Sequence, residues 1–153
     1  MMTDEMLRRL RRISGRVGRA ESSPRLLYLE DVYTPTYVGG TTAGVTTYSI
    51  QQGWYWRMGH ALFVTGLVVW TTATGTGTAQ ISLPFAPSAT AGFRASGSLR
   101  TTTVTFANGT PQLLISPTLA LFTMDSPLTN AASAAVVIEA AGNVSFSAFY
   151  GVD

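Results

Sequence analysis

The residues able to carry out acid–base or metal chemistry are few in this chain of 153 residues, and they lie far apart in it. The only histidine, His60, follows Gly59 and has no acidic cluster beside it in the sequence. Zinc sites need several N or S donors, and a catalytic histidine needs a neighbour that orients its ring. We therefore expect His60 to be a satisfied residue at the end of a strand, and we expect no catalytic and no metal site.

The carboxylates and the missing cysteines lead to the same expectation. Glu30 and Asp31 are adjacent, whereas Asp125 and Glu139 stand alone. Glycoside cleavage needs two carboxylates at a fixed separation across the bond, and no motif here indicates such a pair. The chain has no cysteine, which excludes disulfides, thiolate ligands and cysteine nucleophiles. The sequence thus predicts a protein that is not an enzyme and needs no cofactor.

Four aromatic residues offer a different chemistry, the stacking of sugar rings: Trp54, Tyr55, Trp56 and Trp70. Aromatic residues at strand spacing are more often part of a core or a subunit interface, so both interpretations stay open. Alternation along a strand puts Trp54 and Trp56 on one face and Tyr55 on the other. We expect the face with the two indoles to be the buried one.

A basic arm precedes the rest of the chain. Residues 1–25 hold seven arginines against three acidic residues, a net charge of +4, and residues 26–153 carry −2. Apolar residues recur in the arm at spacings of four, three and four, which predicts a short amphipathic helix after Thr3. The apolar stripe consists of Met6, Leu10, Ile13 and Val17, and the other faces carry arginines that include Arg8, Arg9 and Arg12.

A helix this short is marginally stable alone, so the arm is expected to bind a partner or to associate with copies of itself. Its guanidinium groups suit carboxylates of a neighbouring protein, and the apolar stripe favours that contact over DNA phosphates. A small nucleic-acid-binding protein is the alternative that the arm alone motivates, and a frayed solubilising tail is another. Because of the apolar stripe, we do not expect nucleic acid as the partner. We also expect no membrane partner, because the longest apolar stretch, residues 61–70, is too short to span a bilayer.

The chain becomes β throughout after a linker at residues 21–24, where Pro24 ends any helix. Turn signals, among them Gln52-Gly53, separate short apolar or alternating runs. The predicted strands are residues 33–38, 45–51, 54–58, 61–72, 78–83, 98–106, 112–115, 119–124, 134–139 and 143–150. So many short strands predict an all-β fold, a jelly-roll-like antiparallel β-sandwich over residues 26–153, preceded by the arm over residues 1–25.

Only 12% of the residues are charged, against about 25% in an average soluble domain. So few charges leave much apolar surface, which monomeric proteins seldom expose in one patch. The apolar stretches 113–121 and 132–141 add to it. The composition therefore predicts an oligomer.

The middle of the chain resembles a known family. The matching residues are Tyr33-Thr34-Pro35-Thr36, Tyr48, Gly53-Trp54-Tyr55-Trp56-Arg57-Met58-Gly59, Leu62-Phe63-Val64, Gly66-Leu67-Val68-Val69, Gly75, Gly77 and Ile81-Ser82-Leu83-Pro84-Phe85. Their order over about residues 33–85 resembles β-sandwich domains of tailed-phage structural proteins, which include tail fibres, minor tail proteins and head fibres. In that family the matching residues mark the fold and do not form a site.

The resemblance implies a homotrimer on the surface of a phage virion that contacts other virion proteins of the tail or capsid. It also implies an outward-facing domain that attaches to the host or decorates the particle. A minor tail or fibre-type protein is the first interpretation. A capsid decoration or head-fibre protein is the alternative, because the chain has no long fibre shaft. A carbohydrate-binding receptor module that contacts a glycan of the host surface is the alternative of another class.

Overall fold

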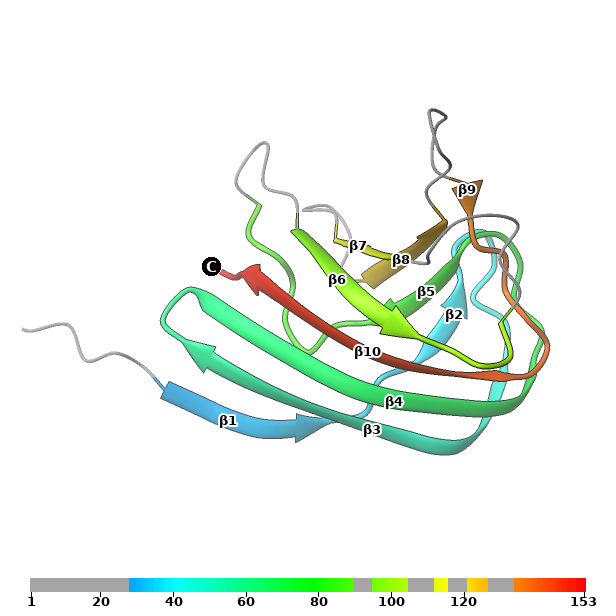
Figure 1. Cartoon of the computed structure of the whole chain (residues 1–153), viewed down its shortest axis with the longest axis horizontal. Helices are drawn as coiled ribbons and strands as arrows, with labels where there is room; N and C mark the ends of the chain where they lie inside the picture. The colour runs from blue at the N-terminus through cyan, green and yellow to red at the C-terminus, as the bar shows by residue number, and fades with distance from the viewer. Residues whose placement is uncertain (1–27, 90–94, 105–111, 116–120, 127–133) are drawn as a thin grey trace, which may run out of the picture.

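The computed structural model describes residues 28–89, 95–104, 112–115, 121–126 and 134–153 (Figure 1). The predicted all-β class is confirmed, because the described residues form antiparallel strands and no helix. The strands are β1 Tyr28–Tyr33, β2 Tyr37–Gly39, β3 Thr46–Met58, β4 Ala61–Ala73, β5 Ala79–Ser82, β6 Ala95–Arg100, β7 Gln112–Ile115, β8 Leu121–Ser126, β9 Ala134–Ala135 and β10 Gly142–Gly151. The predicted N-terminal helix lies outside the described residues. Within the described part of the chain, no helix is long and apolar enough to cross a membrane.

The strands pair in one continuous order, β1-β3-β4-β10-β6-β7-β8-β5-β2, and β9 pairs with β8. The two ends of this order, β1 and β2, are consecutive in the sequence, so the path bends back on itself. The strands β1, β3, β4 and β10 lie side by side, and the strands β2, β5, β7 and β8 lie behind them (Figure 1). A single core fills the space between the two groups of strands.

The core follows from alternation in the long strands. Every second side chain of β10 from Val144 to Tyr150 is buried, as the alternating pattern predicts. β4 contributes Leu62, Val64, Val68 and Trp70, and the facing strands contribute Tyr37, Ile81, Leu113 and Ile115. Leu113 and Ile115 thus belong to the core and not to a subunit interface. The prediction that the stretch 113–121 adds apolar surface is therefore wrong for these two residues.

Two aromatic residues join the groups of strands. The Tyr37 ring of β2 stacks on Trp70 of β4 with the ring centroids 4.0 Å apart. The Trp70 indole donates a hydrogen bond to the Glu139 carbonyl at 2.9 Å, and the Glu139 backbone N–H donates to the Tyr37 hydroxyl at 3.0 Å. Both polar groups of one backbone residue are therefore satisfied by a stacked pair that also fills the core.

Two predicted boundaries around Tyr33 and Gly53 are wrong. The predicted strand 33–38 is the end of β1 and the start of β2, because the chain crosses between the groups of strands at residues 34–36. The predicted turn at Gln52-Gly53 does not form, and β3 runs through it. A Cβ atom at Gly53 would overlap the Tyr33 ring, so glycine is needed there for close packing rather than for a turn.

Three further predicted strands differ in extent. β6 begins at Ala95 and ends at Arg100, earlier than the predicted strand 98–106, and residues 101–104 are not in a strand. β9 covers two residues, where the prediction extended to Glu139. In both places side-chain contacts replace the ladder, since Asn143 hydrogen-bonds to Thr102 and Glu139 to the aromatic pair.

Removing a tyrosine hydroxyl should have opposite consequences at two positions. Tyr150 donates a hydrogen bond to the Phe85 carbonyl at 3.0 Å, whereas the buried Tyr33 hydroxyl has no partner among the described residues. Tyr150→Phe should lower the free energy of unfolding by about 1 kcal/mol, and Tyr33→Phe should leave it unchanged or raise it. Urea unfolding of both variants measures the difference, and an equal loss in the two would contradict the structure.

Tyr33, Tyr150 and the buried Tyr37 together predict a loss of stability in alkali. Burial raises the pKa of Tyr37 from 10.0 to about 12 and raises the pKa of Tyr33 and Tyr150 as well. Above pH 10 the unfolded chain therefore binds fewer protons than the folded protein, and stability falls as the pH rises. Thermal melts from about pH 8 to pH 12 should show a falling Tm, with a smaller fall in Tyr33→Phe. A Tm independent of pH over this range would contradict the raised pKa of these tyrosines.

Candidate functional site

The outer face of β1, β3, β4 and β10 carries an apolar surface, which we call the aromatic strip. Its members are Tyr28, Val32, Trp54, Trp56, Met58, Phe63 and Phe149, and one acidic residue, Glu30, lies among them opposite Trp56. Pairing places Trp56 opposite Phe63, and Phe63 opposite Phe149. The Trp56 and Phe63 rings lie 5.4 Å apart, and Phe149 is 62% exposed. A row of large apolar side chains on an open face is typical of an interaction surface.

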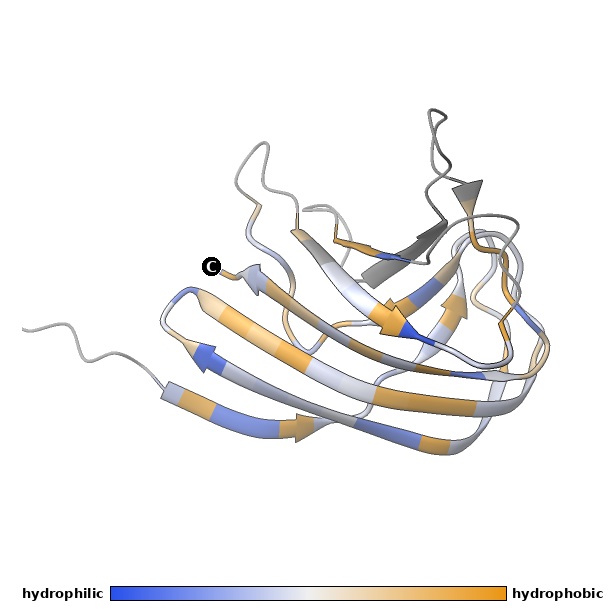
Figure 2. Ribbon diagram, viewed as in Figure 1, coloured by the Kyte–Doolittle hydropathy of each residue, from blue (hydrophilic) through white to orange (hydrophobic). Residues whose placement is uncertain are grey.

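β4 shows why this face is apolar. Hydrophobic residues run along much of its length instead of alternating with polar ones (Figure 2). Leu62 and Val64 point into the core, and Phe63 between them points outward with 39% of its surface exposed. A strand that is apolar on both faces is expected when both faces are covered in the functional state.

The four aromatic residues singled out in the sequence are divided between the two faces. Tyr55 and Trp70 are buried in the core, whereas Trp54 is 43% exposed and Trp56 is partly exposed. The expectation that Trp54 and Trp56 would be buried is therefore wrong. The Tyr33 ring covers Gly53 on the inner face of the uninterrupted strand β3, and Tyr55 follows on that same face.

The buried Tyr55 belongs to an aromatic group at one end of the core. Its ring meets Phe85 edge to face at 5.2 Å and Tyr33 at 6.4 Å. The Arg57 guanidinium lies 5.4 Å from the Phe85 ring centroid and donates hydrogen bonds to the carbonyls of Gly59 and Asp153 at 2.8 Å each. Phe85 thus packs against the core at this end.

The titratable residues that the structure describes are not gathered into a reactive group. His60 Nδ1 lies 2.9 Å from the Val152 carbonyl oxygen, the contact expected of a satisfied strand-end histidine. The Asp153 carboxylate accepts hydrogen bonds from the Ser88 hydroxyl and the Ala89 N–H, and both bonds lower its pKa. These bonds hold Asp153 against the loop after β5. Among the described residues, no three histidine or acidic side chains are grouped as metal ligands.

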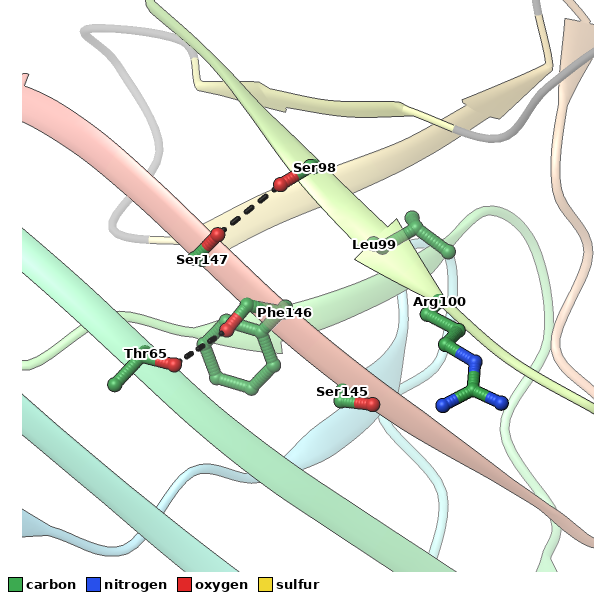
Figure 3. A pocket seen from close by; sticks show the side chains of 7 residues that line it. All are labelled: Thr65, Ser98, Leu99, Arg100, Ser145, Phe146 and Ser147. Atoms are coloured by element: carbon green, nitrogen blue, oxygen red, sulfur yellow. Dashed lines mark hydrogen bonds between the residues drawn. The ribbon is translucent and has the colours of Figure 1, made fainter.

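Polar side chains cover the other part of the outer face, which we call the hydroxyl shelf. It consists of Thr65, Ser98, Arg100, Ser145 and Ser147, from β4, β6 and β10 (Figure 3). These side chains line a shallow hollow of about 290 Å³. No sequence motif marks this surface, although Ser145 and Ser147 alternate with buried residues and Arg100 is one of only three arginines beyond residue 25.

The edges of the sheet are less available than this face. At the β1 edge, the Asp31 carboxylate accepts a hydrogen bond from the Val32 backbone N–H at 2.8 Å. At the β2 edge, the Tyr48 hydroxyl accepts from the Tyr37 N–H at 2.8 Å and donates to the Tyr37 carbonyl at 3.1 Å. Side chains of the protein itself thus occupy main-chain groups that a pairing strand would need.

The predicted docking residues of the arm, from Met6 to Val17, lie outside the described residues. Comparison of the chain with protein-family models, with curated proteins and with solved structures gave no match.

Proposed function

We propose that this chain is a non-enzymatic structural protein of a phage particle, with an outward-facing β-domain that forms a homotrimer. The domain is a β-sandwich of jelly-roll type, and residues 1–25 form the helical arm that docks it on other virion proteins. The exposed aromatic strip carries the proposal. Only 12% of the residues are charged, and the strip exposes large apolar side chains. Assembly of the chain is favourable because it removes these side chains from water.

The blocked edges support assembly through a face. Pairing of β1 with a strand of another copy would have to displace the Asp31 carboxylate from the Val32 N–H. Burial of Trp54, Phe63 and Phe149 requires no such rearrangement, because these side chains already point outward. A closed ring of copies buries the strip on every subunit and leaves no copy with an open apolar face.

The location in the particle rests on the resemblance of residues 33–85 to tailed-phage domains. A tail location, as a minor tail or fibre-type protein that contacts the host surface, is the proposal. Capsid decoration is its alternative, and imaging of labelled particles distinguishes the two. Both locations use the arm as the attachment, since its apolar stripe and its charge of +4 are separate from the mildly acidic domain.

Assembly through the strip predicts the mass of the protein and of one variant. Light scattering of the purified chain should give about three times the subunit mass of 16.3 kDa. Trp54→Ser combined with Phe149→Ser should give folded monomers, because the apolar contact is lost while the core is untouched. Val137→Ser is the matched control, since Val137 is 64% exposed, much like Phe149 at 62%, but lies outside the strip. A wild-type monomer at micromolar concentration, or a double variant that remains a trimer, would contradict the proposal.

Attachment by the arm predicts a second phenotype. Leu10→Asp with Ile13→Asp places two charges in the proposed apolar contact, which should cost several kcal/mol where the contact excludes water. The variant should fold and form trimers but fail to enter virions, as measured by its amount in purified particles. Binding to the particle should weaken only modestly between about 50 and 200 mM salt, unlike binding to DNA phosphates. Normal incorporation of the variant would show that the docking surface is on the β-domain.

A further inference from the structure

We propose that the hydroxyl shelf binds a carboxylate-bearing sugar, such as a uronic acid unit of an acidic polysaccharide. In this complex Arg100 pairs with the carboxylate, and the serine and threonine side chains bind the sugar hydroxyls. The inference goes beyond a structural role in a particle and does not depend on the trimer, because it concerns different residues from the aromatic strip.

Arg100 occupies the central position. It is the last residue of β6 and pairs with Ser145 of β10. Two hollows, of about 290 and 280 Å³, meet there, and Arg100 and Ser145 line both of them. Within the described part of the chain, neither the Arg100 nor the Ser145 side chain has an ion pair or a hydrogen bond. A guanidinium fork without a partner can accept a carboxylate in two parallel hydrogen bonds.

The first hollow supplies hydroxyl groups. The Ser98 and Ser147 hydroxyl oxygens are 3.0 Å apart and share one hydrogen bond, and the Thr65 hydroxyl donates to the Phe146 carbonyl at 3.1 Å (Figure 3). A hydroxyl has one proton and two lone pairs, so each of these groups keeps bonding capacity toward a ligand. These side chains are on neighbouring strands, which fixes their spacing at that of the sheet.

The second hollow supplies an apolar wall and a rigid rim. Leu67 and Val69 line it from β4, and Thr102 and Asn143 complete it. The Asn143 amide donates to the Thr102 hydroxyl at 2.8 Å and accepts from the Thr102 N–H at 3.2 Å, which holds the rim in place. A sugar ring has an apolar C–H face and polar edges, and the two hollows together present matching apolar and polar groups.

The pairing of the strands favours a sugar over a peptide. β4 pairs with β3 and β10, and β10 also pairs with β6 from Ser145 to Ala148, so these two strands leave no free main-chain edge under the first hollow. A peptide strand that adds to a sheet needs such an edge. The two hollows present a cation and hydroxyls from the shelf and two aliphatic side chains, those of Leu67 and Val69.

The test uses the full-length chain and an oligogalacturonate of about six units, with calorimetry or ligand-observed NMR as the readout. The oligogalacturonate should bind, and its fully methyl-esterified form should bind about tenfold more weakly or worse, because the ester removes the charge. Raising the salt to about 1 M should weaken binding of the acid form. Arg100→Gln should lose about tenfold in affinity, and Arg100→Lys should recover part of it, because the charge returns without the fork.

Two hydroxyl variants locate the ligand on the shelf. Ser147→Val should weaken binding, whereas Thr71→Val should not, because Thr71 is on the same face of β4 but outside both hollows. Thermal melts show that each variant is folded.

Four results would overturn the inference: equal binding of the ester, unchanged binding by Arg100→Gln, preference for a phosphorylated oligosaccharide, or no binding of the acid at millimolar concentration. A change in the number of subunits per assembly in Arg100→Gln would also overturn it, since the shelf would then be a subunit contact. A strip variant that remains a trimer while sugar binding is retained would refute only the strip as the subunit contact.

Discussion

The contact between Tyr37 and Trp70 is the interaction on which the rest of the structure depends. The two rings stack at 4.0 Å across the core, and their polar atoms bind the N–H and the carbonyl of Glu139. β2, β4 and the segment before β10 are thereby joined at one point, although they are distant in the sequence. Without the two hydrogen bonds, Glu139 would bring two unpaired main-chain groups to the edge of the core, which is costly. With them, the strand path closes over a single apolar interior.

Close packing at glycine determines which side chains face outward. Gly53 of β3 lies under the Tyr33 ring, and Gly66 of β4, its partner in the sheet, lies against the Phe146 ring. Neither position has room for a Cβ atom, so the two strands can place large rings directly over the main chain. Gly53 is therefore on the inner face of β3. Because side chains alternate, Tyr55 then points into the core and Trp54 points to the surface.

The outer face is thereby divided into two surfaces of different chemistry on the same strands. Toward β1 it is the aromatic strip, and toward β6 it is the hydroxyl shelf with Arg100. The two need not compete, because apolar association and recognition of a hydrophilic ligand use different rows of side chains. We infer that one face serves both the assembly of the subunits and the binding of a sugar. The edges, where Asp31 and Tyr48 satisfy main-chain groups, serve neither.

The sequence by itself determined the all-β class, the long strands β4 and β10 and the core side of β10, because alternation and turn residues are local properties. The tertiary structure decided the uninterrupted course of β3 through Gly53, the crossing at residues 34–36 and the exposure of Trp54. A glycine reads as a turn in sequence, but here the ring of Tyr33 requires it. The shelf around Arg100 also arises only in the fold, since its residues come from three strands that are separated by long stretches of sequence. Pairing partners, and the core side of a strand such as β3 that carries aromatic residues on both faces, depend on contacts between distant residues, and no local pattern specifies them.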